Sequence, residues 1–134
     1  MDAPEIKSSS GSLETVLLVE PEESARGVIS EFLRECGFEV ILAESGEDAL
    51  KMIERGSSIS VVLAAVKLQG DMNGFHLARN IRTYYPDIDV LLVSDDAESA
   101  EAASDLCDEG PMEKPYHPKE VLGRIRALRA RRQR

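Results

Sequence analysis

Short apolar runs alternate with segments of helical periodicity along the chain. Each run is continuously apolar, which is typical of a strand that is buried on both faces of a sheet. The predicted strands are residues 15–19, 38–43, 61–65, 89–94 and a short segment at Met112. Strands that alternate with helices in this way predict an α/β fold, a doubly wound parallel sheet of five strands with five helices on its two faces.

The predicted helices lie between these runs, where apolar residues recur at the spacing of one helix face. Pro21 lies near the start of the first helix, and Gly37 ends it. Ser45 caps the second helix, which Gly56 stops, and Pro118 opens the last one. The expected inward faces, from the first helix to the fifth, are Val28, Ile29, Phe32, Leu33 and Cys36; Ala49, Leu50 and Ile53; Phe75, Leu77, Ala78 and Ile81; Ala97, Ala100, Ala103 and Leu106; and Val121, Leu122, Ile125 and Leu128.

The composition excludes several classes of protein. The net charge is −9, which argues against general binding to nucleic acids or anionic membranes. No apolar run is long enough to span a bilayer, and the first residues lack the pattern of a signal peptide. Cys36 and Cys107 have no metal-ligand spacing, and Cys36 ends an apolar helical stripe, which favours a reduced, packed thiol. We therefore expect a cytoplasmic protein.

The sequence divides into three parts. Residues 1–13 include a Ser-rich stretch with nothing to bury and are expected to form a flexible leader. Residues 14–128 have the length and apolar content of a single domain, and residues 129–134 form a basic tail. The charge is uneven: residues 95–109 hold seven acids and no base, whereas residues 124–134 hold six arginines and no acid.

Functional residues are expected where the strands end. In an open parallel sheet, the crevice that binds ligands lies at the carboxyl ends of the strands. The residues at these ends are Glu20, Ala65, Ser94 and Lys114.

The residues around these strand ends resemble the receiver domain of bacterial response regulators. The motifs that carry the likeness are Val16-Leu17-Leu18-Val19-Glu20, Gly37-Phe38-Glu39-Val40, Ala43-Glu44-Ser45-Gly46-Glu47-Asp48-Ala49-Leu50, Gly70-Asp71-Met72-Asn73-Gly74, Leu91-Leu92-Val93-Ser94 and Glu113-Lys114-Pro115-Tyr116. Each motif is weak alone, but their order and spacing are specific, and the likeness covers residues 14–128. The resemblance implies a flavodoxin-like sheet with the strand order 2-1-3-4-5.

In the receiver family, two acids after the first strand hold Mg²⁺, and an aspartate after the third strand attacks the phosphohistidine of a kinase. A Ser or Thr after the fourth strand and a Lys after the fifth contact the phosphoryl oxygens, so that the metal and the lysine neutralise the transferred charge. By this resemblance, Glu20, Ser94 and Lys114 are retained. The resemblance also implies a cis bond between Lys114 and Pro115, which aims the lysine into the crevice.

Two positions depart from the family pattern. Ala65 matches the phosphoryl acceptor, or Val66 does if the following loop has the shortest family length. No Asp or Glu lies between Glu54 and Asp71. Pro21 matches the second of the paired acids. Because Mg²⁺ prefers near-octahedral oxygen coordination, we expect its binding to be weak or absent, and we expect no cofactor.

The retained residues also have simpler interpretations. Lys114 pairs with Glu20 or reaches solvent if no anion occupies the crevice. Ser94 caps the helix that follows its strand.

Together these residues predict a pseudo-receiver, a two-component signalling module that acts by protein–protein contact without aspartyl phosphorylation and is not an enzyme. The alternative is a receiver with a displaced acceptor such as Asp71. A third hypothesis, nucleic-acid binding through the arginines, is opposed by the acidic body of the chain. The expected partner is a histidine kinase, an effector domain, or a second copy that docks through the fourth helix, the fifth strand and the fifth helix.

Overall fold

A parallel sheet forms the centre of the molecule. The computed structural model describes residues 14–56, 58–94, 112–113 and 118–132. Its strands are β2 (Thr15–Val19), β3 (Glu39–Ala43), β4 (Val61–Ala65), β5 (Asp89–Ser94) and β6 (Met112–Glu113). They form a five-stranded sheet in the order β3-β2-β4-β5-β6, and every neighbouring pair is parallel. In chain order this is 2-1-3-4-5, the arrangement of a flavodoxin-like fold.

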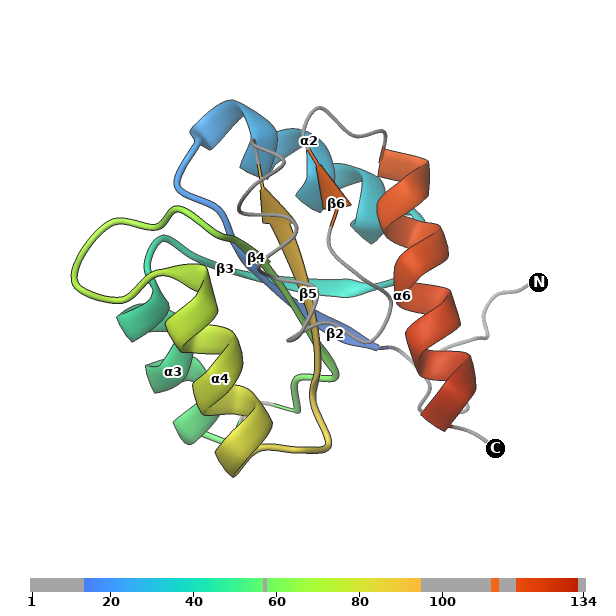
Figure 1. Cartoon of the computed structure of the whole chain (residues 1–134). Coiled ribbons are helices and arrows are strands. Elements are labelled where there is room, and N and C mark those ends of the chain that lie inside the picture. The colour runs from blue at the N-terminus through green and yellow to red at the C-terminus, as the bar shows by residue number, and fades with distance from the viewer. Residues whose placement is uncertain (1–13, 57, 95–111, 114–117, 133–134) are drawn as a thin grey trace.

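Helices cover both faces of this sheet. They are α2 (Glu23–Glu35), α3 (Gly46–Glu54), α4 (Gly74–Tyr84) and α6 (Pro118–Arg132). Helices α3 and α4 lie side by side on one face, and α2 and α6 lie on the other (Figure 1). The predicted helix at 97–106, the predicted leader at 1–13 and Cys107 lie outside the described residues. Residues 129–132, which the sequence assigned to a basic tail, belong to α6.

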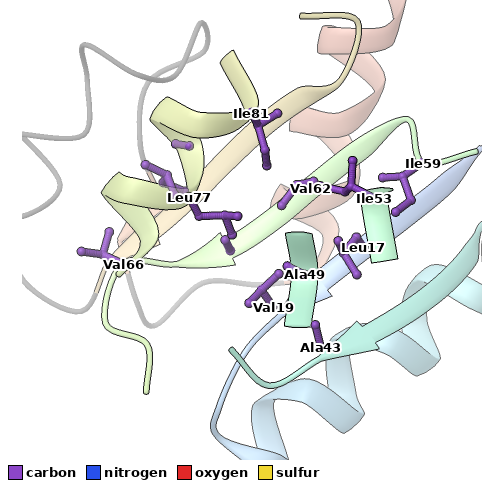
Figure 2. Close-up of a cluster of buried hydrophobic side chains, with 13 residues drawn as sticks. Leu17, Val19, Ala43, Ala49, Ile53, Ile59, Val62, Val66, Leu77 and Ile81 are labelled. Atoms are coloured by element: carbon purple, nitrogen blue, oxygen red, sulfur yellow. The ribbon is translucent and has the colours of Figure 1, made fainter. Parts of the chain in front are cut away.

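The strands divide the buried side chains between two clusters, because successive residues of a strand point to opposite faces. Figure 2 shows the cluster beneath α3 and α4, where Leu17 and Val62 meet Ala49, Leu77 and Ile81. On the other face, apolar residues of the strands pack against α2 and α6; this second cluster comprises Val16, Leu18, Val61, Leu63, Leu91, Val93, Ile29, Leu33, Val40, Val121 and Ile125. Both faces are therefore buried, as continuous apolar strands require.

The local signals at the helix ends are those that the sequence predicted for α2 and α3. Gly37 has a φ of 99° directly after α2, a left-handed conformation that glycine adopts without steric cost. The side chain of Ser45 accepts a hydrogen bond from the backbone N–H of Asp48 at 3.1 Å, which caps α3. Cys36 is a free, half-buried cysteine at the end of α2.

The prediction for one apolar residue of α2 was wrong. Val28 was expected to face the core, but 59% of its surface is exposed. The buried face of α2 contains Ile29, Ser30 and Leu33, and Val28 lies outside it. Successive helix residues are about 100° apart around the helix axis. When the buried face is narrow, two adjacent apolar residues do not both fit within it, and here Ile29 is buried while Val28 is exposed. None of the helices within the described ranges is long and apolar enough to cross a bilayer.

Candidate functional site

The carboxyl ends of β2 and β4 place two of the expected site residues on neighbouring strands. Val19 is paired with Ala64, so Glu20 and Ala65 are the next residues along this register. Glu20 is 3% exposed and Ala65 is 5% exposed. Ala65 is two residues beyond Leu63, whose side chain faces α2 and α6, and strand alternation therefore directs the Ala65 methyl group toward the same face. A methyl group offers neither a nucleophile nor a metal ligand there.

Val66 lies in a different environment from Ala65. Its side chain is 4% exposed and belongs to the cluster beneath α4, beside Leu77 (Figure 2). Its backbone N–H donates to the carbonyl of Val93 at 2.8 Å, which continues the contact between β4 and β5. The two positions that the sequence could not separate thus point to opposite faces of the sheet.

The Glu20 carboxylate is bound to the start of the first described helix. Its Oε2 atom accepts a hydrogen bond from the backbone N–H of Glu22 at 3.0 Å. The guanidinium of Arg26 donates to the backbone carbonyl of Glu20 at 2.9 Å. Between these residues, Pro21 is half-buried and its side chain has no donor or acceptor. The turn from β2 into α2 is therefore held by contacts within the chain.

Sequence reasoning missed Arg26 as a residue of this turn. The helical pattern did place it in the early turns of the helix that follows Glu20, where a long side chain can reach back toward the end of the strand. Its contact with a backbone carbonyl depends on the local path of the turn, which a residue pattern does not specify.

The loop after β4 is packed closely on the end of that strand. The backbone N–H of Gly74 donates to the carbonyl of Val66 at 2.8 Å. A Cβ atom at Gly74 would overlap the carbonyl oxygen of Ala65 and would lie 2.8 Å from the Cα of Val66. Only glycine fits this contact without displacing the backbone, so α4 begins directly against the end of β4.

Asp71, the alternative acceptor, is an exposed residue of this loop. Its neighbours are held near α3: Met72 packs against Gly46, and Gly70 lies near the carboxylate of Glu47. Gln69 also forms a bridge with Ser45. The segment that carries Asp71 is thus bound to the α3 side of the sheet, whereas the Ala65 side chain is directed toward the α2 and α6 side.

The remaining expected site residues are only partly described. Ser94 ends β5, and its backbone is paired with that of Glu113 in β6. Lys114 and Pro115 lie outside the described residues, as does the bond between them. Among the residues that the structure does describe, no group of three or more His, Cys, Asp or Glu side chains is placed to hold a metal ion.

Comparison with known proteins agrees with this fold. The family model of the response regulator receiver domain matches residues 16–126. The chain belongs to this family. It is a receiver domain of the two-component type.

Two relatives show how much of a longer protein such a domain occupies. The chain is 34% identical to the sensor kinase CckA of Brucella abortus, over 85% of its own length and 12% of that protein. It is 31% identical to the sensory transduction protein RegX3 of Mycolicibacterium smegmatis, over 85% of its own length and 50% of that protein. The chain thus spans half or less of the length of these relatives.

A solved structure has the same fold over its whole length. The response regulator TrrA of Thermotoga maritima, in complex with Mg²⁺ and BeF, matches 87% of this chain and 99% of its own. The two are 26% identical in sequence and superpose with a TM-score of 0.78.

Proposed function

We propose that this receiver domain is a pseudo-receiver, which signals through protein–protein contact and accepts no phosphoryl group in its crevice. The observation that carries the proposal is the methyl side chain of Ala65 at the carboxyl end of β4. Phosphoryl transfer to a receiver needs a carboxylate at this strand end, positioned for in-line attack. Alanine cannot supply one.

The register of the sheet supports Ala65 as the acceptor position. Ala65 is buried beside the end of β2, where Glu20 follows, whereas the Val66 side chain packs beneath α4 on the other face. An acceptor must lie near the acid that would hold the metal, and the backbone directs residue 65 toward that region. The proposal does not depend on this choice, because neither side chain is nucleophilic.

The geometry of the turn after β2 supports weak or absent binding of Mg²⁺. Of the three acidic positions of the family pattern, Glu20 alone holds an acid here, and it already accepts a hydrogen bond from the Glu22 N–H. Mg²⁺ requires near-octahedral oxygen coordination and usually one or two carboxylates with several waters. A single buried carboxylate that is engaged elsewhere is a poor site for it.

The alternative function, phosphorylation on a displaced acceptor, needs Asp71 to reach the crevice. In favour of it, Asp71 is exposed and is close in sequence to the missing acceptor. Against it, both neighbours of Asp71 are held near α3. An attacking carboxylate must approach phosphorus to about 3–3.5 Å, so the whole loop would have to move.

Receiver domains in general are signalling modules that work with histidine kinases and effector domains, and we propose a partner of one of these kinds. We also propose that the module has no enzymatic activity of its own and acts in the cytoplasm. The basic helix α6, together with β6, is the surface that we propose for this partner or for a second copy of the chain.

The deciding experiment is incubation with acetyl phosphate and Mg²⁺, followed by intact-mass measurement. We expect no phosphorylated species from the unmodified chain or from Asp71→Ala. A mass increase of one phosphoryl group that disappears in Asp71→Ala would replace the proposal with the displaced-acceptor alternative. A positive control is any receiver with an intact acceptor, treated in the same tube.

The matched reconstruction is Ala65→Asp combined with Pro21→Asp. If the rest of the crevice is competent, this variant gains Mg²⁺ binding in a calorimetric titration while the unmodified chain shows none. Ala65→Asp alone tests whether a carboxylate at this position suffices for phosphorylation. If the double variant folds normally but does not bind Mg²⁺, then the assignment of Ala65 and Pro21 to the acidic positions is wrong.

A further inference from the structure

A single arginine near the end of α6 contacts residues at the amino ends of three strands. Nε of Arg129 lies 3.1 Å from Oε2 of Glu14, the residue before β2. Nη1 of the same guanidinium lies 3.0 Å from Oδ2 of Asp89, the first residue of β5. Nη1 is also 3.5 Å from the carbonyl oxygen of Ser60, the residue before β4. This group of residues, which we name the Arg129 latch, lies at the end of the sheet opposite to the crevice.

The Arg129 latch is shielded from water more than an ordinary surface ion pair. The side chain of Arg129 is 22% exposed, that of Glu14 is 23% exposed and that of Asp89 is 5% exposed. Charge-assisted hydrogen bonds in such a setting are stronger than neutral ones and are less screened by salt. The latch therefore contributes more to the stability of the folded chain than an isolated exposed ion pair does.

The apolar contact between helix α6 and the rest of the domain is narrow. Among its described side chains, Val121, Ile125 and Leu128 are the buried apolar ones, and Val121 and Ile125 belong to the cluster between the sheet and α2. The helix carries six cations and one acid, and Arg126 and Arg129 are three residues apart, a spacing at which like charges repel one another. The latch neutralises Arg129 and so relieves this repulsion.

Gly123 weakens the same helix. It is exposed in the interior of α6, and a Cβ atom at this position would meet nothing within 4 Å. A glycine in a helix interior favours the unfolded chain, and no packing contact here requires it. Helix α6 thus carries many like charges and has a low helix propensity at Gly123. The contacts of Arg129 hold it to the sheet near its carboxyl end.

We propose that α6 is a releasable strap: it opens from the sheet as a separate unit, and the Arg129 latch sets how often it does so. Opening breaks the contacts of Arg129 and uncovers the apolar side chains of Ile29 and Leu33 on α2, while β2, β4 and β5 remain paired. The Arg129 latch lies at the opposite end of the sheet from Ala65, so its contacts involve none of the expected site residues.

The test is hydrogen exchange of the full chain in increasing urea, read by mass spectrometry for peptides from α6 and from β4. Local opening exposes little surface, so we expect the α6 amides to exchange through a step that depends weakly on urea. The β4 amides should exchange through global unfolding, which depends strongly on urea. If α6 and β4 follow the same urea dependence in the unmodified chain, the strap does not exist.

Substitutions of the three charged residues test whether the Arg129 latch controls the opening of α6. Arg129→Met keeps the aliphatic stem, and combining it with Glu14→Gln and Asp89→Asn avoids a buried unpaired carboxylate. We expect this triple variant to increase the opening of α6 at least about tenfold, the scale of one lost charge-assisted hydrogen bond. Arg126→Met removes an exposed cation from the same helix and is the matched control, for which we expect no increase.

Helix propensity supplies the converse variant. Gly123→Ala strengthens α6 without touching the latch, so it should slow the exchange of α6 amides several-fold, both in the unmodified chain and in the triple variant. A latch variant with unchanged α6 exchange would overturn the assignment of Arg129. An Arg126→Met control that opens α6 as much as the triple variant does would show that net charge, and not the latch, controls the helix.

Discussion

At the scale of single residues, the proposal of a pseudo-receiver depends on Ala65 and Pro21, the two positions that depart from the family pattern. Ala65 ends β4 with a methyl group where phosphoryl transfer would need a carboxylate. Glu20 remains and is buried, but its carboxylate accepts a hydrogen bond from the turn that follows it. A residue that is retained in type can therefore serve the structure of a turn, and the type alone does not show that a metal site persists.

The start of α4 carries a second residue-scale feature. The side chain of Asn73 accepts from the N–H of His76 at 2.9 Å, and Nδ1 of His76 accepts from the N–H of Asn73 at 3.3 Å. This reciprocal pair is a capping box, in which His76 occupies the place usually held by Glu or Gln. It satisfies two backbone donors at the end of the loop that packs on Ala65.

His76→Ala should therefore lower the free energy of unfolding by about 0.5–1 kcal/mol, the usual size of a lost helix cap. His76→Gln preserves an acceptor at the same position and should remain within about 0.3 kcal/mol of the unmodified chain. Urea denaturation followed by circular dichroism measures both. Equal losses in the two variants would mean that the ring of His76 contributes by packing and not as an acceptor.

At the scale of elements, two helix glycines differ in whether packing requires them. A Cβ atom added to Gly27 in α2 would meet nothing within 4 Å, whereas a Cβ atom added to Gly74 would overlap the end of β4. The first glycine has no packing reason to be present. The second is required because α4 starts in contact with the backbone of Ala65 and Val66.

Gly27→Ala should therefore raise the free energy of unfolding by about 0.5–1 kcal/mol through helix propensity and a less flexible unfolded chain. Gly74→Ala, the same change in chemistry, should lower it by about 1–3 kcal/mol because the backbone must move to admit the methyl group. Thermal or urea unfolding of the two variants measures whether each substitution raises or lowers the free energy of unfolding. A stable Gly74→Ala variant would show that the β4–α4 loop is softer than its contacts indicate.

The edge strand β3 is protected by a side chain of the neighbouring helix. Nη2 of Arg34 in α2 donates to the backbone carbonyl of Val40 at 3.1 Å. Along a strand, the backbone N–H and carbonyl groups of successive residues point alternately to the two neighbouring sides. The N–H of Glu39 donates to the carbonyl of Glu14 on the β2 side, so the carbonyl of Val40, the next residue, points to the open side of β3. An unpaired strand edge is a template for association with another chain.

Arg34→Ala should leave this carbonyl open and increase slow self-association at high protein concentration. Light scattering at 37 °C, over hours, measures the effect. Arg79→Ala removes an exposed arginine from α4, where no strand edge lies, and is the matched control. If both variants aggregate at the same rate, loss of charge and not exposure of the edge is responsible.

At the scale of the whole molecule, charge is separated along the chain. The net charge is −9, yet α6 carries six cations and one acid. Individual exposed ion pairs contribute little, about 0–1 kcal/mol, but a set of complementary charges can orient a partner and speed its approach. The basic helix is therefore the surface that we propose for an acidic partner or a second copy.

We expect any self-association to weaken as salt increases, which sedimentation velocity at low and high ionic strength measures. Arg126→Glu reverses an exposed charge of α6 and retains Arg129 in the chain, so it should abolish the association at low salt. Removal of residues 129–134 would be a poorer test, because it also removes the Arg129 latch. A monomer under all conditions would leave a different protein as the partner.

Residue patterns were enough to predict the alternation of strands and helices and the strand order of the family that the motifs resemble; that no acceptor carboxylate ends β4 stays a prediction. These features follow from local signals: continuous apolar runs, helical periodicity, caps, and the residue types at strand ends. The patterns could not choose between Ala65 and Val66, because the two assignments differ by one residue of loop length. The structure adds that the two side chains point to opposite faces of the sheet, which supports Ala65 but does not test its role. They placed Val28 inward, because a periodic pattern does not show how wide the buried face of a helix is.

The Arg129 latch could be found only in the folded chain. The run of arginines predicts a basic tail from Arg129 onward, whereas in the structure Arg129 binds Glu14 and Asp89, which are 115 and 40 residues away in the chain. Nothing in the local pattern around any of the three residues indicates the other two. The fold brings these charges together, since the parallel sheet aligns the amino ends of strands that are distant in sequence.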